Sequence, residues 1–176
     1  LYLNAGDGTF TDVAQERGVQ RPVDSFPAWF WDFDNDGALD LYVSTFYQSV
    51  GEARLGPIVA SHLKLPVKQD LNKLYRGDGR GNFTDVAAAQ GLDLFTVIMG
   101  ASFGDLDNDG FPDMYLGTGY PFYDGLVPNV MYRNQGGQRF ADVTTAGGFG
   151  HLQKGHGIAF ADLDQDGDQD VYANMG

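Results

Sequence analysis

The chain contains 176 residues, of which 43% are hydrophobic, and it carries a formal net charge of −13. The hydrophobic content excludes a disordered chain, the acidic excess argues against a nucleic-acid partner, and no apolar run approaches the roughly 18 residues that span a membrane. Because cysteine is absent, disulfides and thiolate metal sites are also excluded. All acidic residues except Glu16 and Glu52 are Asp, a bias that indicates loops, turns and oxygen-ligand sites.

The sequence contains three copies of one repeat, which align without a gap at residues 1–44, 74–117 and 131–174. Each copy opens on a Leu-Tyr or Met-Tyr pair, continues through a Phe-Thr-Asp-Val or Phe-Ala-Asp-Val segment and then reaches an acidic loop. Four aromatic residues per copy keep the same phase, and we expect them to pack one repeat onto the next. They are Tyr2, Phe10, Phe30 and Tyr42; Tyr75, Phe83, Phe103 and Tyr115; and Tyr132, Phe140, Phe160 and Tyr172.

The pattern within a copy predicts short strands. Residues 29–33 and 39–45 are expected to be strands joined by the first acidic loop, and residues 73–76 and 82–86 to form a second hairpin. The segment that follows is predicted to form one helical turn, with Asp85 as its N-cap and Gly91 closing it. Four short antiparallel strands per repeat predict a β-propeller blade.

A nine-residue acidic loop, D-x-D-x-D-G-x-x-D, joins the first and second predicted strands of each blade. Carboxylates at positions 1, 3 and 5 of such a loop converge on one point, and the glycine at position 6 allows the sharp turn. Hard oxygen ligands in this number favour Ca²⁺ over Mg²⁺. An EF-hand is excluded, because Val43, Leu116 and Ala173 stand at position 12 in place of its glutamate. The alternative is an acidic, solvated turn without a metal.

Three stretches of the sequence carry a family resemblance: LYLNAGDGTFTDV at 1–13, FGDLDNDGFPDMYLG at 103–117 and GHGIAFADLDQDGDQDVY at 155–172. The repeat resembles the FG-GAP/VCBS family of propeller blades, as in integrin α-subunit heads. It is most similar to the cartilage-acidic-protein-like and the bacterial, ASPIC/UnbV-associated members. The resemblance implies an all-β fold in which residues 1–176 form a partial β-propeller of about three four-stranded antiparallel blades. Because propellers have about four to eight blades, we expect a fragment of a larger propeller.

The resemblance also implies that an Asp at position 9 closes each loop, so three calcium sites are expected between the first and second strands of the blades. Their predicted ligands are Asp32, Asp34, Asp36 and Asp40; Asp105, Asp107, Asp109 and Asp113; and Asp162, Asp164, Asp166 and Asp170.

The length variation between copies lies on one face of the predicted assembly. In a four-stranded meander the metal loops share one face, whereas the insert at 47–72, the connection at 118–130 and the segment at 150–157 share the other. Tyr120, Phe122 and Tyr123 are expected to add exposed aromatic character to this second face.

A polar cluster on the second face departs from the repeat. His151, Lys154 and His156 stand where the second copy has apolar residues, which makes them candidate contacts for a ligand. The alternative is that they are surface residues specific to one blade.

These patterns predict a calcium-binding, non-catalytic recognition or scaffold module, which would bind a protein or carbohydrate ligand on the face opposite the calcium loops. Extracellular calcium modules have Kd values of about 0.1–1 mM, so we expect a secreted or cell-envelope protein, with cell adhesion as one variant. The alternative is a polysaccharide lyase or hydrolase on a propeller scaffold, which needs a base or paired carboxylates outside the loops. Only isolated acids such as Asp24, Asp70 and Asp124 are available for that role.

Overall fold

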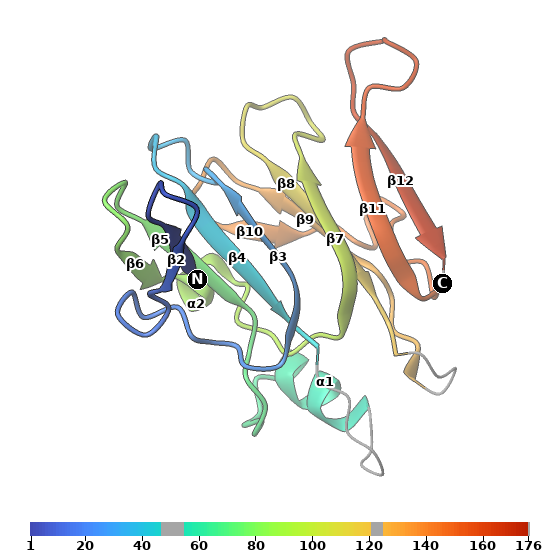
Figure 1. Ribbon diagram of the computed structural model, residues 1–176. Helices are drawn as coiled ribbons and strands as arrows, with labels where there is room; N and C mark the ends of the chain where they lie inside the picture. The colour runs from blue at the N-terminus through green and yellow to red at the C-terminus, as the bar shows by residue number, and fades with distance from the viewer. Residues whose placement is uncertain (47–54, 121–124, 176) are drawn as a thin grey trace.

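The computed structural model describes residues 1–46, 55–120 and 125–175. In these residues the strands form two four-stranded and two two-stranded sheets, and every pairing between neighbouring strands is antiparallel. Figure 1 shows the sheets following one another through the molecule. The all-β prediction is therefore confirmed, and the arrangement is that of a propeller-like fragment.

Each sequence copy contributes its first two strands to one sheet and its last two strands to the next. The first two-stranded sheet contains β1 (Tyr2–Asn4) and β2 (Phe10–Asp12). The first four-stranded sheet contains β3 (Ser25–Trp31), β4 (Asp40–Thr45), β5 (Lys73–Gly77) and β6 (Phe83–Asp85). The second contains β7 (Ile98–Gly104), β8 (Asp113–Thr118), β9 (Val130–Asn134) and β10 (Phe140–Asp142). The last sheet contains β11 (Gly155–Ala161) and β12 (Asp170–Met175).

The main core lies between the two four-stranded sheets. It combines Trp31, Phe33 and Tyr42 of the first with Met114 and Phe140 of the second, and each is at most 3% exposed. The ring of Trp31 stacks on that of Phe140, with centroids 5.7 Å apart. Burial of such large side chains is the dominant stabilising contribution to packing between sheets.

The predicted packing role of the aromatic residues is correct inside this core but wrong at several other positions. Tyr2, Phe10 and Tyr172 are 69%, 61% and 68% exposed, and Phe30 is 46% exposed. The first three belong to the two-stranded sheets. Tyr42 and Tyr75 are buried because they lie in the middle strands of a four-stranded sheet. Repeat phase alone therefore does not decide whether an aromatic side chain is buried.

Backbone contact between the second four-stranded sheet and β11 is unusually close. A Cβ atom placed on Gly100 would lie 1.3 Å from the carbonyl oxygen of His156, and one on Gly117 would lie 2.6 Å from that of Gly155. Only glycine permits this approach, because any side chain would overlap the neighbouring strand.

Two short helices accompany the sheets. Helix α2 (Ala87–Gln90) is the predicted turn, and Gly91 closes it in the left-handed conformation with φ of 77°. The N-cap is Val86 and not Asp85 as predicted. The Asp85 carboxylate instead accepts a hydrogen bond of 3.1 Å from the N–H of Ala87, a local turn contact that competes with helical capping.

Helix α1 (Leu55–His62) lies in the insert, where no helix was predicted. Its Ile58 and Ser61 side chains are buried, and the Ser61 hydroxyl accepts a hydrogen bond of 2.7 Å from the N–H of Phe95. In the described part of the chain, no helix has both the length and the apolar character needed to cross a membrane.

The acidic loops and α1 lie at opposite ends of the sheets. Figure 1 shows the connections β3–β4, β7–β8 and β11–β12 at one end and α1 at the other. Tyr120, which was predicted to be exposed on the face opposite the acidic loops, is only 2% exposed because it joins a cluster with Ile58, Phe95 and Val97. Phe122 and Tyr123 lie outside the described residues.

Candidate functional site

The three acidic loops have the same backbone conformation. Positions 4 and 6 of each loop adopt positive φ angles, which asparagine and glycine tolerate better than other residues. At position 4 the angles are 56° for Asn35, 56° for Asn108 and 63° for Gln165, and at position 6 they are 86° for Gly37, 88° for Gly110 and 98° for Gly167. The repeated residue types thus specify one loop shape three times.

The same hydrogen bonds hold this shape in each loop. In the first loop the Asp32 carboxylate accepts from the N–H groups of Asp36 and Gly37, both at 3.0 Å, and the Asp36 carboxylate accepts from Ala38 at 2.8 Å. The equivalent distances are 3.1, 2.9 and 2.9 Å in the second loop and 3.1, 3.0 and 3.0 Å in the third. Hydrogen bonds within each loop therefore hold its conformation without a bound ligand.

The Asp at position 9 accepts a hydrogen bond from its own loop, and in the first two loops it also accepts one from the third strand of the sheet. Asp40 accepts hydrogen bonds from the N–H groups of Phe33 at 3.0 Å and Gly77 at 2.9 Å. Asp113 accepts from Leu106 at 2.7 Å and Asn134 at 2.7 Å, and Asp170 accepts from Leu163 at 2.9 Å.

Asp40 and Asp113 are completely buried, and burial raises the pKa of each carboxyl to about 6. The backbone N–H donors oppose this rise in pKa, and the neighbouring loop carboxylates reinforce it. Their negative charges are therefore undercompensated by the protein alone, which is the electrostatic condition that a bound cation corrects.

Carboxylate oxygens converge within each loop. One oxygen from each of three Asp residues lies within 4.8 Å of the other two, in groups formed by Asp32, Asp34 and Asp36; Asp105, Asp107 and Asp113; and Asp162, Asp164 and Asp166. The structure therefore brings nine of the twelve predicted ligands together. The other three are Asp40 and Asp170, which bond to the backbone as described, and Asp109, which accepts from Phe111.

The first loop contains a buried oxygen that the protein does not satisfy. Asp34 Oδ1 is buried and accepts no hydrogen bond from the described residues, whereas Oδ2 lies 2.7 Å from Arg76 Nη2. Burial raises the pKa of Asp34, although the Arg76 charge acts in the opposite direction. A buried carboxylate oxygen without a donor is costly, and a hard cation among these carboxylates would satisfy it. The donor set thus fits a divalent metal of the calcium type.

An arginine on the third strand accompanies each of the first two loops. Arg133 on β9 occupies the position of Arg76 on β5, and its Nη1 lies 3.6 Å from Asp107 Oδ2. The position-3 carboxylate of the first loop and that of the second therefore each have one partial counter-charge already. The spacing of the acidic residues alone did not predict this pairing, although the shared phase of the two arginines is visible in the repeat alignment.

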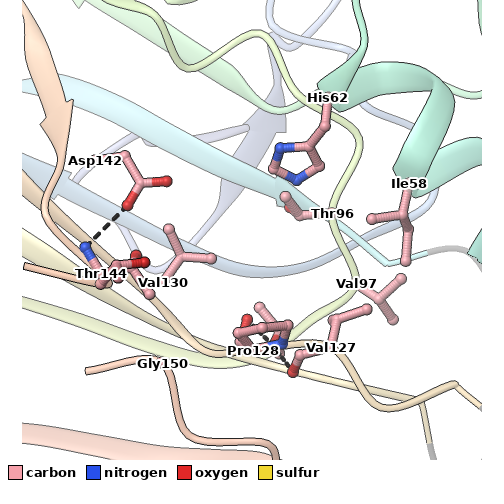
Figure 2. A pocket seen from close by; sticks show the side chains of 12 residues that line it. Ile58, His62, Thr96, Val97, Val127, Pro128, Val130, Asp142, Thr144 and Gly150 are labelled. Atoms are coloured by element: carbon pink, nitrogen blue, oxygen red, sulfur yellow. Dashed lines mark hydrogen bonds between the residues drawn. The ribbon is translucent and has the colours of Figure 1, made fainter. Parts of the chain in front are cut away.

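A cavity of about 430 Å³ lies on the opposite face. Ile58 and His62 of α1 line one part of it, and Val130, Asp142 and Thr144 line another. Figure 2 shows the His62 ring and the Asp142 carboxylate on different sides of this space. The sequence patterns assigned no role to either residue, because His62 lies in the non-repeating insert and Asp142 belongs to a motif common to all copies.

The three polar residues predicted as ligand contacts do not line this cavity. His151 lines a second cavity together with Tyr115 and Phe149, and the lining of that cavity includes neither Lys154 nor His156. His156 lies on β11, and its ring Nδ1 is 3.1 Å from the carbonyl oxygen of Lys154.

The structure bears on one of the isolated acids considered for catalysis, Asp70. Asp70 is partly buried, which raises its pKa, but the Val23 N–H and the Arg21 guanidinium outweigh this effect and hold the pKa below its usual value. A general base needs a pKa near the working pH, so Asp70 is unsuited to that role. Asp124 lies outside the described residues.

Comparison with known proteins agrees with the repeat structure. The sequence matches the FG-GAP-like repeat over residues 63–116 and 123–173, which together make up more than half of the chain. Cartilage acidic protein 1 of Xenopus tropicalis is 26% identical over 165 residues, covering 93% of this chain and 23% of that protein. Cartilage acidic protein 1 of Mus musculus is 34% identical over 92 residues, covering 51% of this chain and 13% of that protein. The chain thus spans less than a quarter of the length of these relatives, and it belongs to the FG-GAP-like repeat family.

Proposed function

We propose that this chain is a calcium-stabilised, non-catalytic recognition module of a secreted or cell-envelope protein. The observation that carries the proposal is the acidic loop geometry, which recurs three times with the same hydrogen bonds and leaves Asp34 Oδ1 buried without a donor. Membership of the FG-GAP-like repeat family supports it further.

Each loop would hold one Ca²⁺ through its aspartates at positions 1, 3 and 5, with the position-9 aspartate closing the site. Calcium supplies positive charge where several carboxylates are packed together, and it takes six to eight oxygen ligands in a flexible geometry. An ion present at a hundredfold excess over its Kd adds about 2.7 kcal/mol of stability per site. Three sites would supply a large share of the roughly 5–15 kcal/mol that stabilises a typical domain.

The proposed location follows from calcium availability. Extracellular calcium modules have Kd values of about 0.1–1 mM, and sites of this affinity are filled only where calcium is abundant. Secretion or attachment to the cell envelope satisfies that condition.

The ligand of the module, a protein or carbohydrate, is proposed to bind on the face opposite the calcium loops. His151, Lys154 and His156 remain candidate contacts there. Both cavities that involve residues 150–153 support this placement, because Gly150 lines the first and His151 and Gln153 line the second.

Thermal unfolding in 5 mM calcium and in EGTA tests the metal proposal. We expect a melting temperature at least several degrees higher in calcium, and we expect calorimetric titration to give three bound ions per chain. Asp34→Asn should reduce the calcium-dependent shift, whereas Asp7→Asn, which removes an acid from a hairpin outside the loops, should leave the shift unchanged. Identical melting temperatures in calcium and EGTA would overturn the proposal.

A further inference from the structure

The cavity on the second face combines an aliphatic wall with one carboxylate. Ile58, Val97, Val127 and Val130 supply the apolar surface, and Asp142 is the one acidic residue among the described residues that line it. His62 lies across the space from Asp142 in Figure 2. A pocket of this composition suits a ligand that has an apolar stem and a positively charged end.

Asp85 occupies in the first four-stranded sheet the position that Asp142 occupies in the second, and its charge is neutralised by a lysine of the same sheet. Asp85 pairs through Oδ2 with Lys73 Nζ at 2.7 Å, while its Oδ1 accepts a hydrogen bond from Ala87. Lys73 lies on β5, two residues before the partner of Asp85 in the strand register. The first complete blade therefore contains its own ammonium–carboxylate pair at this position.

In the second four-stranded sheet no lysine stands at the corresponding position. Asp142 Oδ1 accepts a hydrogen bond of 2.9 Å from Thr144, just as Asp85 Oδ1 accepts from Ala87. Val130 stands where Lys73 stands in the first blade, again two residues before the register partner, Tyr132. No described residue forms an ion pair with Asp142. The second blade thus presents the carboxylate without its cation, beside a cavity.

We propose that this cavity binds the side chain of a lysine from a protein partner, with the ammonium at Asp142 and the methylene stem against the aliphatic wall. The proposal rests on the proposed recognition function and names its ligand chemistry. Lysine is favoured over arginine because the equivalent carboxylate Asp85, whose Oδ1 makes the same backbone hydrogen bond, takes a lysine ammonium on its Oδ2.

Titration of the calcium-loaded chain with small amines, followed by NMR, tests this proposal. Affinity should rise about fourfold per methylene from propylamine to pentylamine, because each buried methylene adds a constant increment. Nα-acetyl-lysine methylamide should bind at least as tightly as butylamine, and its arginine counterpart should bind more weakly. If the free amine binds and the lysine derivative is excluded, a protein lysine is not the ligand. An uncharged oligosaccharide that occupies the cavity while the amines do not would also overturn the proposal.

Two variants locate the site. Asp142→Asn should weaken amine binding about tenfold, whereas Asp85→Asn, the matched change in the first blade, should leave it unchanged. Val130→Lys should abolish binding, because it supplies the pair that Lys73 and Asp85 already form in the same fold. Full amine affinity in folded Val130→Lys or Asp142→Asn protein would overturn the proposal. The calcium-dependent melting shift, measured on the same samples, reports separately on the metal sites.

Discussion

The side-chain amide of Asn35 donates a hydrogen bond of 2.8 Å to the carbonyl oxygen of Gly110, the turn glycine of the next acidic loop. Asn108 repeats the relationship one loop further on, donating to the Gly167 carbonyl at 3.1 Å and to Asp168 Oδ1 at 2.7 Å. The position-4 residue of one loop therefore fixes the position-6 backbone of its neighbour. Three loops that are separated in sequence form one hydrogen-bonded series.

Removing this link should weaken the second loop. Asn35→Ala is expected to lower the free energy of unfolding by about 1 kcal/mol, the usual contribution of one hydrogen bond, and to lower calcium affinity at the second loop. Urea unfolding and calcium titration measure the two effects. Gln165→Ala is the matched control, because Gln165 occupies position 4 but makes no hydrogen bond with the described residues. Equal effects of both variants would contradict the prediction.

Arg76 should stabilise the calcium-free protein more than the calcium-bound one. Its guanidinium pairs with Asp34 and lies 5.3 Å from the centroid of the Phe33 ring, so it offsets loop charge that calcium would also offset. Arg76→Met is expected to lower the melting temperature in EGTA and to widen the gap between EGTA and calcium. Arg80→Met removes an exposed positive charge from the adjacent hairpin and serves as the control. A gap that stays constant would show that Arg76 and calcium do not act on the same carboxylates.

The Asp70–Arg21 pair should contribute stability only above acid pH. Because the folded pKa of Asp70 is lowered, its contribution is present above the unfolded value near 3.8 and is lost as pH falls through the folded value. Asp70→Asn should cost at most about 1 kcal/mol at pH 7, since the pair is partly exposed. Urea unfolding of both proteins should give stabilities that converge as the pH is lowered further and further below 3.8. A cost that persists unchanged as the pH falls would refute the electrostatic explanation.

Gly100→Ala should be strongly destabilising. The new Cβ would lie 1.3 Å from the His156 carbonyl oxygen, so β7 and β11 must separate. We expect a loss of more than about 3 kcal/mol, measured by urea unfolding, because overpacking of backbone against backbone cannot be relieved by a rotamer change. Gly6→Ala is the control, since its Cβ would meet nothing within 4 Å and it should cost only the roughly 1–2 kcal/mol of a left-handed alanine. Similar losses for both would argue against close packing as the cause.

The strands and acidic loops were predictable because their signals are local. A loop such as Asp32–Asp40 is specified by spacing within nine residues, and the strands flank it directly. Helix α1 gave no such signal, because Gly56 and Pro57 lie in its first turn and its sequence is not repeated. Proline is compatible with a first helical turn, but it conceals the helix from propensity arguments.

The remaining features depend on contacts between distant residues. Tyr2 and Tyr75 hold the same phase in the repeat, yet one is 69% exposed and the other only 3%, because burial depends on which sheets lie beside them. The cavity was not predicted because it joins α1 to residues near Asp142, about eighty positions away in the chain. The alignment of the copies contains one sign of the cavity, because Val130 stands at the position of Lys73.

Each sequence copy divides its strands between two sheets, and this has a consequence for the covalent chain. Each copy has four strands and each complete sheet has four strands, but a complete sheet takes two strands from one copy and two from the next. A cut in the connection between β4 and β5 would leave both pieces joined by the ladder from Leu41–Tyr75 to Val43–Lys73. Duplication of one copy would add one four-stranded sheet to the series. The arrangement therefore lets the series change in length by whole sheets.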